Sequence, residues 1–157
     1  MKKIPLIHNI IATSCGFGHF PFAPGTMGAI FGILVWLPLF LMCNYTSMMY
    51  ITIGLIIVFT VLGVWSAGVA EKYWGEDPSR VVMDETVGMW ITLLTIPPHG
   101  HWLYIVAAFI LFRFFDIVKP LGVRKMENLK GGYGIMGDDI LAGMYGALII
   151  YAFSYFM

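Results

Sequence analysis

The sequence predicts an all-α protein: a polytopic integral membrane bundle of about five apolar helices with additional short interfacial helices. Composition is the first indication, because 59% of the 157 residues are hydrophobic and only 11% are charged, whereas a soluble domain carries about 25% charged residues. The second is that long segments carry no charge at all, and the third is that the charged residues gather in three groups. No repeat, linker or low-complexity segment divides the chain, so residues 1–157 are expected to form one membrane-embedded domain.

Three segments contain no Asp, Glu, Lys or Arg: residues 4–70, 86–112 and 140–157. Because a membrane-spanning helix needs ~20 mostly apolar residues, the first segment has room for two spans, separated by the polar break CNYTS. The second contains a break of its own, PPHGH, so two spans fit there only if they borrow charged residues at their ends. The predicted spans are 26–42, 48–70, 81–96, 102–118 and 139–157.

Five crossings bring every group of charged residues to the same side of the membrane. The groups lie within 2–3, 71–85 and 113–139, whereas the turns on the opposite side, near 43–47 and 97–101, contain no charged residue. Since positively charged loops stay in the cytoplasm, the charged side is predicted to be the cytoplasmic face. Pro120 is expected to open a short surface helix that continues to about Leu129.

Composition also excludes several classes of partner. The formal net charge is zero, which argues against a nucleic-acid partner. The two cysteines, Cys15 and Cys43, have no CxxC spacing and are interpreted as buried thiols rather than as a disulfide framework or a metal site. Oligomeric state is left open by the sequence.

Asp84 and Glu85 stand at the start of the third predicted span, in VVMDETVGMW. As neighbours on a helix they point about 100° apart, so they need not bind one ion, although both can line one pocket. The alternative is that they are ordinary carboxylates at a helix N-terminus, where the helix dipole favours them.

Arg113, Asp116 and Lys119 follow one another at intervals of three in FRFFDIVKP, so each successive pair shares a helix face. One interpretation is a ladder of ion pairs that stabilises the helix end. The other is a phosphate clamp, in which arginine offers a planar fork and lysine a point charge. The surrounding Phe, Ile and Val residues would desolvate such a clamp.

Asp138 and Asp139 head the last apolar run, behind four glycines in GGYGIMGDDILAG. One aspartate is expected to cap the final helix, which leaves the other without a structural reason. Carboxylates beside a phosphate suit Mg²⁺, which proteins commonly hold through one or two carboxylates together with substrate oxygens and water.

The segment GFGHFPFAPGTMG, residues 16–28, is the fourth candidate. Thr26 is predicted to cap the first span, and Gly25 with two prolines predicts a compact turn. Backbone N–H groups at a turn followed by a helix start can bind an anion. His19 is a candidate acid or ligand, although a lone histidine is more often a hydrogen-bonded structural group.

Carboxylates suited to a divalent cation, cationic side chains suited to an anion and a position at the membrane surface together indicate work on a phosphorylated lipid head group. Hydrolysis there would need Mg²⁺ to polarise the phosphoryl oxygens and a carboxylate to orient or deprotonate water. No Ser-His-Asp arrangement, CxxC pair or HExxH motif competes with this interpretation.

The four motifs, in this order and over about residues 13–147, resemble the phosphatidylglycerophosphatase A family. The resemblance implies a Mg²⁺-dependent phosphatase of the bacterial inner (cytoplasmic) membrane, with its active site on the cytoplasmic face. It implies removal of the terminal phosphate of the phospholipid phosphatidylglycerophosphate to give phosphatidylglycerol. Residues 1–157 would then form a single phosphatase domain.

Residues and resemblance together predict a role for each candidate side chain. The expected metal ligands, direct or through water, are Asp84, Glu85, Asp138 and Asp139. Arg113 and Lys119 are expected to hold the phosphate, and Asp116 to be a further ligand or the base. With Asp139 these three form the predicted catalytic set. The phosphate pocket would be lined by Gly25, Thr26 and His19.

Three other functions are alternatives. One is a phosphatase for a different lipid phosphate, such as phosphatidic acid. Another is a small transporter or channel subunit, but its polar residues should extend through the bilayer rather than stop at one face. A CDP-alcohol phosphotransferase would show a closely spaced run of four aspartates that is absent here.

Overall fold

The computed structural model describes residues 3–98, 100–120 and 122–156, and the regular secondary structure of this part is helical. No strand occurs among these residues. The elements are α1 (Leu6–Ala12), η1 (Phe17–His19), α2 (Pro24–Met42), α3 (Tyr45–Trp74), α4 (Met83–Leu93), α5 (Leu103–Val118), α6 (Val123–Met126) and α7 (Gly132–Phe156).

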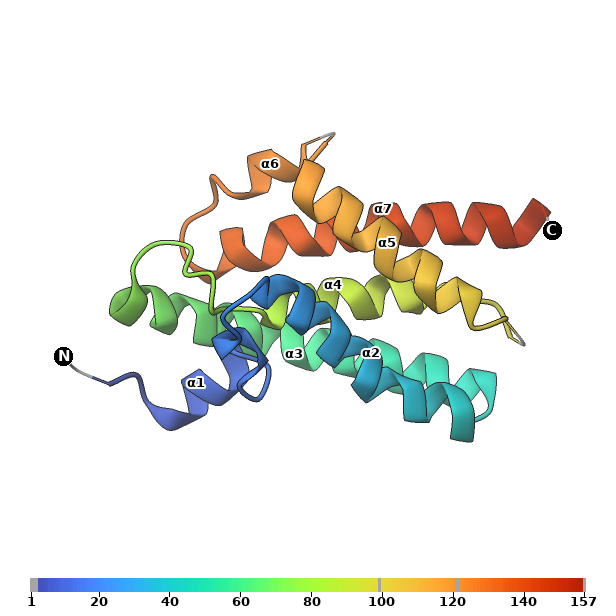
Figure 1. Cartoon of the computed structure of the whole chain (residues 1–157), viewed down its shortest axis with the longest axis horizontal. Coiled ribbons are helices and arrows are strands. Elements are labelled where there is room, and N and C mark those ends of the chain that lie inside the picture. Colours follow the sequence, from blue (N-terminus) through green and yellow to red (C-terminus); the bar gives the residue numbers. More distant parts are fainter. Residues whose placement is uncertain (1–2, 99, 121, 157) are drawn as a thin grey trace.

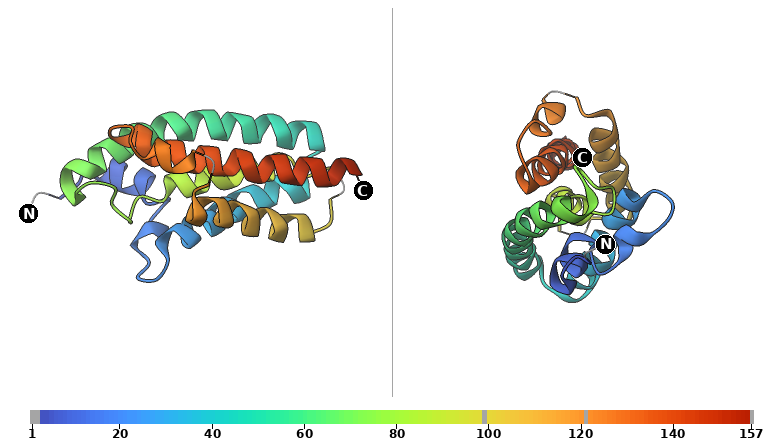
Figure 2. Two further views of the ribbon diagram at one scale, coloured as in Figure 1. Left: turned by 90° about the horizontal axis from the view of Figure 1, so that it is seen from above. Right: turned by 90° about the vertical axis from the view of Figure 1, so that its left-hand side faces the viewer.

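The long helices run along the long axis of the molecule, and successive helices alternate in direction (Figures 1 and 2). The turn between α2 and α3 and the connection between α4 and α5 lie at the end that holds the C-terminus (Figure 1). The N-terminus, the connection from α3 to α4 and the start of α7 lie at the opposite end (Figure 1). The predicted gathering of the charged segments at one end of the bundle therefore matches the arrangement of the helices.

Among the described residues, three helices are long and apolar enough to cross a membrane, namely α2, α3 and α7. The expected count of about five is not confirmed, because α4 has 11 residues and α5 has 16. At ~1.5 Å per residue, α4 is about 16 Å long, well short of a hydrocarbon core of ~30 Å. The shortening has a local cause, since α4 is followed by the pair Pro97-Pro98, which cannot continue a helix.

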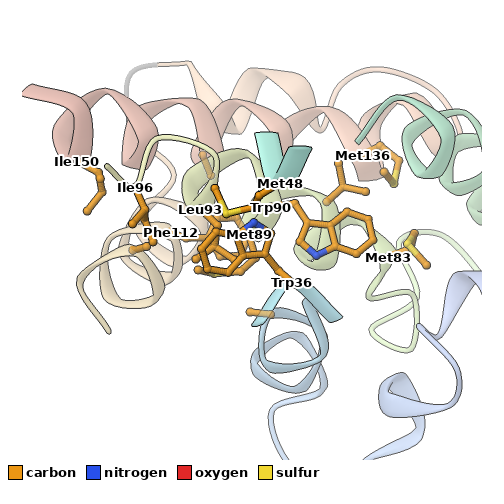
Figure 3. Close-up of a cluster of buried hydrophobic side chains, with 14 of the residues drawn as sticks. Trp36, Met48, Met83, Met89, Trp90, Leu93, Ile96, Phe112, Met136 and Ile150 are labelled. Atoms are coloured by element: carbon orange, nitrogen blue, oxygen red, sulfur yellow. The ribbon is translucent and has the colours of Figure 1, made fainter. Parts of the chain in front are cut away.

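The short helix α4 is the centre of the bundle. It packs against α2, α3, α5 and α7, and nine of its 11 residues are buried. The surrounding core includes Trp36, Trp90 and Phe112, which are almost fully buried, and Figure 3 shows these side chains meeting around α4. Because protein rather than lipid surrounds α4, its helix ends need not reach the membrane surfaces.

Glycines let α4 and α7 approach until their backbones touch. A Cβ atom at Gly143 would lie 2.4 Å from the carbonyl oxygen of Gly88, and one at Gly88 would lie 2.6 Å from that of Asp139. Small residues at such crossings are typical of membrane helix pairs, which associate through close packing. This contact fixes the position of the first turn of α4 relative to the second turn of α7.

Several local predictions were wrong. Ala23, with Pro24 after it, precedes the first turn of α2, so Thr26 is inside the helix rather than its cap. The last helix begins at Gly132, which places the two aspartates well inside it, so neither caps it. Tertiary packing overrides the low helix propensity of glycine here, because Gly132 packs directly on the backbone of Val64.

Two smaller expectations also need correction. The surface helix predicted from Pro120 to about Leu129 is only the four-residue α6, and it follows Gly122, whose φ is +92°. Both cysteines were expected to be buried, but Cys15 is exposed and Cys43 is partly exposed, and neither forms a disulfide. The polar break after α2 was predicted correctly, since Asn44 caps α3 by accepting a hydrogen bond from the Ser47 N–H at 2.9 Å.

Candidate active site

Three carboxylates from two helices converge inside the bundle. Asp84 and Glu85 lie in the first turn of α4, and Asp139 lies in α7. One oxygen atom from each carboxylate falls within 4.8 Å of the others. Asp84 is 8% exposed and Asp139 2% exposed, and Glu85 is partly buried. Residues separated by more than 50 positions in the sequence therefore form one acidic cluster.

The carboxylate cluster is not satisfied by the protein alone. Among the described residues, Asp84 Oδ1 and Glu85 Oε2 are shielded from solvent and have no hydrogen-bond partner. Buried carboxylates without partners are costly, and like charges at this separation repel one another. A divalent cation bound by hard oxygen ligands would remove both costs. The donor set of Asp84, Glu85 and Asp139 therefore fits Mg²⁺.

A cationic side chain from α5 borders this cluster. Arg113 donates a hydrogen bond to Asp116 within an ion pair one helical turn apart, and both are largely buried. The interpretation of these two residues as an ion pair is therefore correct. The carboxylate of Asp116 is also close enough to Glu85 and Asp139 to act on them electrostatically. Arg113 is the cationic residue that α5 contributes next to the acidic cluster.

The start of α2 fills the space between α4 and α5. A Cβ atom on Gly25 would lie 2.2 Å from Glu85 Oε1 and 3.2 Å from Arg113 Nη1, so only glycine fits here without a shift. The first turn of any helix presents N–H groups that lack partners within the helix. The structure thus brings Gly25 to Glu85 and Arg113, and the half-buried Thr26 follows it in the first turn of α2.

Lys119 lies at the other side of the cluster but has partners of its own. Its ammonium group is 2.6 Å from Asp138 Oδ2 and 2.6 Å from Glu127 Oε1. Burial lowers the pKa of Lys119, but hydrogen bonds and charges from Asp138 and Glu127 outweigh this and raise it above the ordinary value. Lys119 therefore remains positively charged at neutral pH. In the ladder interpretation Lys119 would pair with Asp116, but it pairs with Asp138 and Glu127 instead.

Asp138 connects Lys119 to the cluster instead of belonging to it. While Oδ2 binds Lys119, Oδ1 accepts a hydrogen bond from the Asp139 N–H at 3.0 Å. Adjacent residues on a helix diverge by about 100°, so the two aspartates of α7 face different neighbours. Of the four expected metal ligands, the structure brings three together and places Asp138 beside them as the partner of Lys119.

His19 lies apart from the carboxylates. Its Nε2 is 2.9 Å from Asn9 Oδ1, its ring meets Trp74 edge-on with centroids 6.1 Å apart, and its side chain is exposed. It lines a separate cavity with Lys72 and Arg80. Among the described contacts, none joins His19 to the acidic cluster.

Sequence reasoning missed the residues that hold the first turn of α4. Thr86 Oγ1 lies 2.7 Å from Ser14 Oγ, and Thr86 donates to the Gly28 carbonyl at 3.0 Å. These bonds connect α4 to α2 and to the segment after α1.

Glu127, the second partner of Lys119, was missed as well. Threonine and serine among apolar residues carry no distinctive spacing, and Glu127 lies in a loop whose path is set by the fold.

Fold and site together define a helical membrane protein in which a buried cluster of carboxylates adjoins an arginine and a lysine. The sequence profile of the phosphatidylglycerophosphatase A family matches residues 10–154. A phosphatidylglycerophosphatase A from Haemophilus influenzae is 36% identical over 166 aligned positions, covering 100% of this chain and 96% of the relative. The Escherichia coli phosphatidylglycerophosphatase A is 36% identical over 146, covering 91% and 81%.

A third relative has a different name. A Bacteroides thetaiotaomicron protein, provisionally named phosphatidylinositol-3-phosphatase, is 51% identical over 151 residues, covering 96% of this chain and 95% of the relative. No solved structure matches the chain. The chain belongs to the phosphatidylglycerophosphatase A family, and it is therefore an enzyme of the phosphoric monoester hydrolase class.

Proposed function

We propose that the protein hydrolyses the terminal phosphomonoester of phosphatidylglycerophosphate, releasing inorganic phosphate and phosphatidylglycerol, and that it requires Mg²⁺. Family membership supports the substrate. The requirement for Mg²⁺ is supported by the convergence of Asp84, Glu85 and Asp139. Two of these residues have buried oxygen atoms without a hydrogen-bond partner. A bound Mg²⁺ would offset the negative charge of the phosphoryl oxygens and so favour attack at phosphorus.

The surrounding residues provide binding and proton transfer. Arg113 would bind phosphoryl oxygens through its planar guanidinium, and the absence of a side chain at Gly25 leaves room beside it. In hydrolysis a water oxygen attacks phosphorus, the bond from phosphorus to the glycerol oxygen breaks, and the released alcohol takes up a proton. We assign to Asp116 the task of orienting that water or accepting its proton, because its carboxylate adjoins both Arg113 and Asp139.

Lys119 would add positive charge at the edge of the phosphate site. Its position depends on Asp138 and Glu127, which hold the ammonium group from two sides. Asp138 then supports the site through Lys119 and through the Asp139 backbone, and it would reach a bound cation only through water. Thr26 would line the phosphate pocket from the first turn of α2.

The proposal includes a location in the membrane. We place α4 and α5 in the bilayer beside α2, α3 and α7, which gives five apolar helices with the charged end of the bundle at the cytoplasmic face of the bacterial inner membrane. The positive-inside bias supports this orientation, and the exposed apolar side chains along α3 and α7, such as Ile57 and Leu148, support contact with lipid.

Two head groups are candidates for the substrate. The Bacteroides relative favours a second candidate, a phosphatase acting on phosphatidylinositol 3-phosphate. Both substrates present a phosphomonoester on a glycerophospholipid head group, so one site of carboxylates and cations suits either.

Phosphate release from purified lipids tests both candidates. The purified protein in detergent is expected to release phosphate fastest from phosphatidylglycerophosphate, more slowly from phosphatidylinositol 3-phosphate and phosphatidic acid, and not at all after EDTA treatment until Mg²⁺ is restored. Faster turnover of phosphatidylinositol 3-phosphate would transfer the assignment to the second candidate. Full activity in EDTA would remove the role proposed for the metal.

A further inference from the structure

A second polar cavity lies beside α1, away from the acidic cluster. Its volume is about 750 Å³, and it is formed by the N-terminal segment, α1, η1, the last turn of α3 and the loop before α4. None of its lining residues belongs to the candidate active site, apart from His19, which the structure separates from the carboxylates. The lining residues are Lys3, Ile4, Leu6, Asn9, His19, Lys72, Tyr73, Trp74 and Arg80.

The charge of this cavity has one sign. Lys3, Lys72 and Arg80 line it, and no carboxylate does. Among the described residues, none of these three side chains forms an ion pair, whereas Arg113 and Lys119 of the active site do. The cavity therefore presents three cationic side chains that no lining carboxylate neutralises, which favours an anionic occupant.

Trp74 contacts one of the three cations, Arg80. The guanidinium carbon of Arg80 lies 6.0 Å from the centre of its ring, at the outer limit of a cation–π contact. His19 meets the same indole and is also hydrogen-bonded to Asn9. Gly18 lets the loop around His19 close onto the Arg80 backbone, because a Cβ there would lie 2.0 Å from the Arg80 carbonyl oxygen. Arg80 is thus part of an ordered wall of the cavity.

Apolar side chains next to the cavity point to a lipid rather than a free anion. Leu6 lines the cavity and is 72% exposed, and Ile7, Ile10, Phe20 and Phe22 are exposed on α1 and the loop that follows it. A short helix with exposed apolar residues beside basic groups is typical of segments that lie at a membrane surface. Anionic lipids in the cytoplasmic leaflet attract such basic groups.

We propose that this cavity binds the phosphate-bearing head group of an anionic membrane phospholipid, as a site separate from the active site. The acyl chains would lie against Leu6 and the neighbouring apolar residues. The cavity is linked to the catalytic helix, because the Val82 N–H donates to the Ala12 carbonyl at 2.8 Å and Ser14 contacts Thr86. A lipid bound here would therefore stabilise the segment that supports the first turn of α4.

The test compares two double variants with equal loss of charge. K72Q/R80Q removes two cations from the cavity, and R124Q/K125Q removes two exposed cations from α6. Thermal unfolding of each protein in a neutral detergent is followed while phosphatidylglycerol, phosphatidylcholine or inorganic phosphate is titrated in. Phosphatidylglycerol is expected to raise the Tm of the wild type and of R124Q/K125Q at similar concentrations. K72Q/R80Q should need on the order of tenfold more lipid.

Other outcomes would overturn the proposal. Equal responses of K72Q/R80Q and the wild type to phosphatidylglycerol would show that the cavity does not bind it. Equal stabilisation by phosphatidylcholine would remove the requirement for an anionic head group, and the same stabilisation by inorganic phosphate would remove the requirement for a lipid. Since these measurements do not involve turnover, they remain informative if the proposed substrate is wrong.

A measurement on the wild type alone covers the case in which K72Q/R80Q does not fold. An anionic phospholipid carrying a photoreactive group near its head group is irradiated with the protein, and the modified peptides are identified by mass spectrometry. Crosslinks within residues 3–9 or 72–80 are expected, and they should decrease when unlabelled phosphatidylglycerol is added. Crosslinks confined to other segments would contradict the assignment.

Discussion

At the scale of single residues, the site depends on carboxylates that are stable only with a counter-charge. Asp84, Glu85 and Asp139 place oxygens within 4.8 Å of one another in a largely buried position. Without a cation this arrangement opposes folding, because like charges repel and partnerless carboxylates are poorly solvated. Activity and stability should therefore respond in opposite directions when one carboxylate is neutralised.

The substitution Asp139→Asn tests whether activity falls while stability without a cation does not. Phosphate release is expected to fall on the order of 100-fold or more, because a ligand to the proposed cation is lost. In EDTA the variant should be at least as stable as the wild type, since one buried charge is removed. Phosphate release and Tm in EDTA are measured on both proteins, with Glu76→Gln, which removes an exposed carboxylate, as the control. Wild-type turnover by Asp139→Asn would exclude a role for this residue in the site.

Gly25→Ala tests the space between Glu85 and Arg113. The added methyl group would lie 2.2 Å from Glu85 Oε1, so one of the two side chains must move. A displacement of this size is expected to lower phosphate release roughly 10- to 100-fold. Gly54→Ala is the matched control, because a Cβ there meets nothing within 4 Å, and its activity should equal that of the wild type. If both variants kept full activity, Gly25 would not border the phosphate site.

At the scale of elements, the contact between α4 and α7 assembles the cluster. The two helices touch through Gly88 and Gly143, and this contact determines how far Asp139 lies from Asp84. The connection is reinforced on one side by the Thr86 hydrogen bonds to Gly28 and Ser14. On the other side, Lys119 joins α5 to α7 through Asp138.

Gly143→Ala should separate the two helices. Its Cβ would lie 2.4 Å from the Gly88 carbonyl oxygen, so the backbones must move apart, at a cost of about 1–3 kcal/mol in the free energy of unfolding. Both Tm and phosphate release are expected to fall. Gly137→Ala is a control on the same helix, because its Cβ would have only ordinary contacts at 3.6 Å or more. Equal losses in the two variants would contradict a cause specific to the contact with Gly88, because the higher helix propensity of alanine favours stability at both positions.

At the scale of the whole molecule, the orientation in the membrane can be measured with the two native cysteines. Cys15 is exposed in the segment after α1, and Cys43 is partly exposed after α2. Figure 1 shows that these segments lie toward opposite ends of the bundle along its long axis. The membrane therefore lies between the two cysteines if the bundle spans it as proposed.

Single-cysteine variants C43S and C15S report each side separately. A membrane-impermeant maleimide is expected to label Cys15 in inverted membrane vesicles but not in spheroplasts, and to label Cys43 in spheroplasts but not in inverted vesicles. Labelling after detergent solubilisation shows that each thiol is reactive. Labelling of both cysteines from one side would contradict the proposed crossing pattern, and reversed labelling would place the active site on the outer face.

The sequence by itself determined the class of protein, and it singled out the three carboxylates that the structure brings together, Asp84, Glu85 and Asp139. Long segments without charge are typical of membrane bundles, and the spacing of the charged segments predicted that they gather at one end, which matches the arrangement of the helices (Figure 1). The family resemblance needed only the order of four motifs. Helix α1 was not predicted. The break at Pro97-Pro98 is visible in the sequence, but the burial by neighbouring helices that allows an 11-residue helix at the centre is not.

Only the tertiary structure decided which of these side chains meet. Asp138 and Asp139 are equivalent in the sequence, but neighbours on a helix diverge by about 100°, so the rotation of α7 directs one toward α4 and the other toward Lys119. His19 belongs to a motif that also contains Gly25, yet the turn between η1 and α2 separates the two. Contacts between residues far apart in the chain depend on packing at positions such as Gly88 and Gly143, where the distance between two backbones is set by both helices at once.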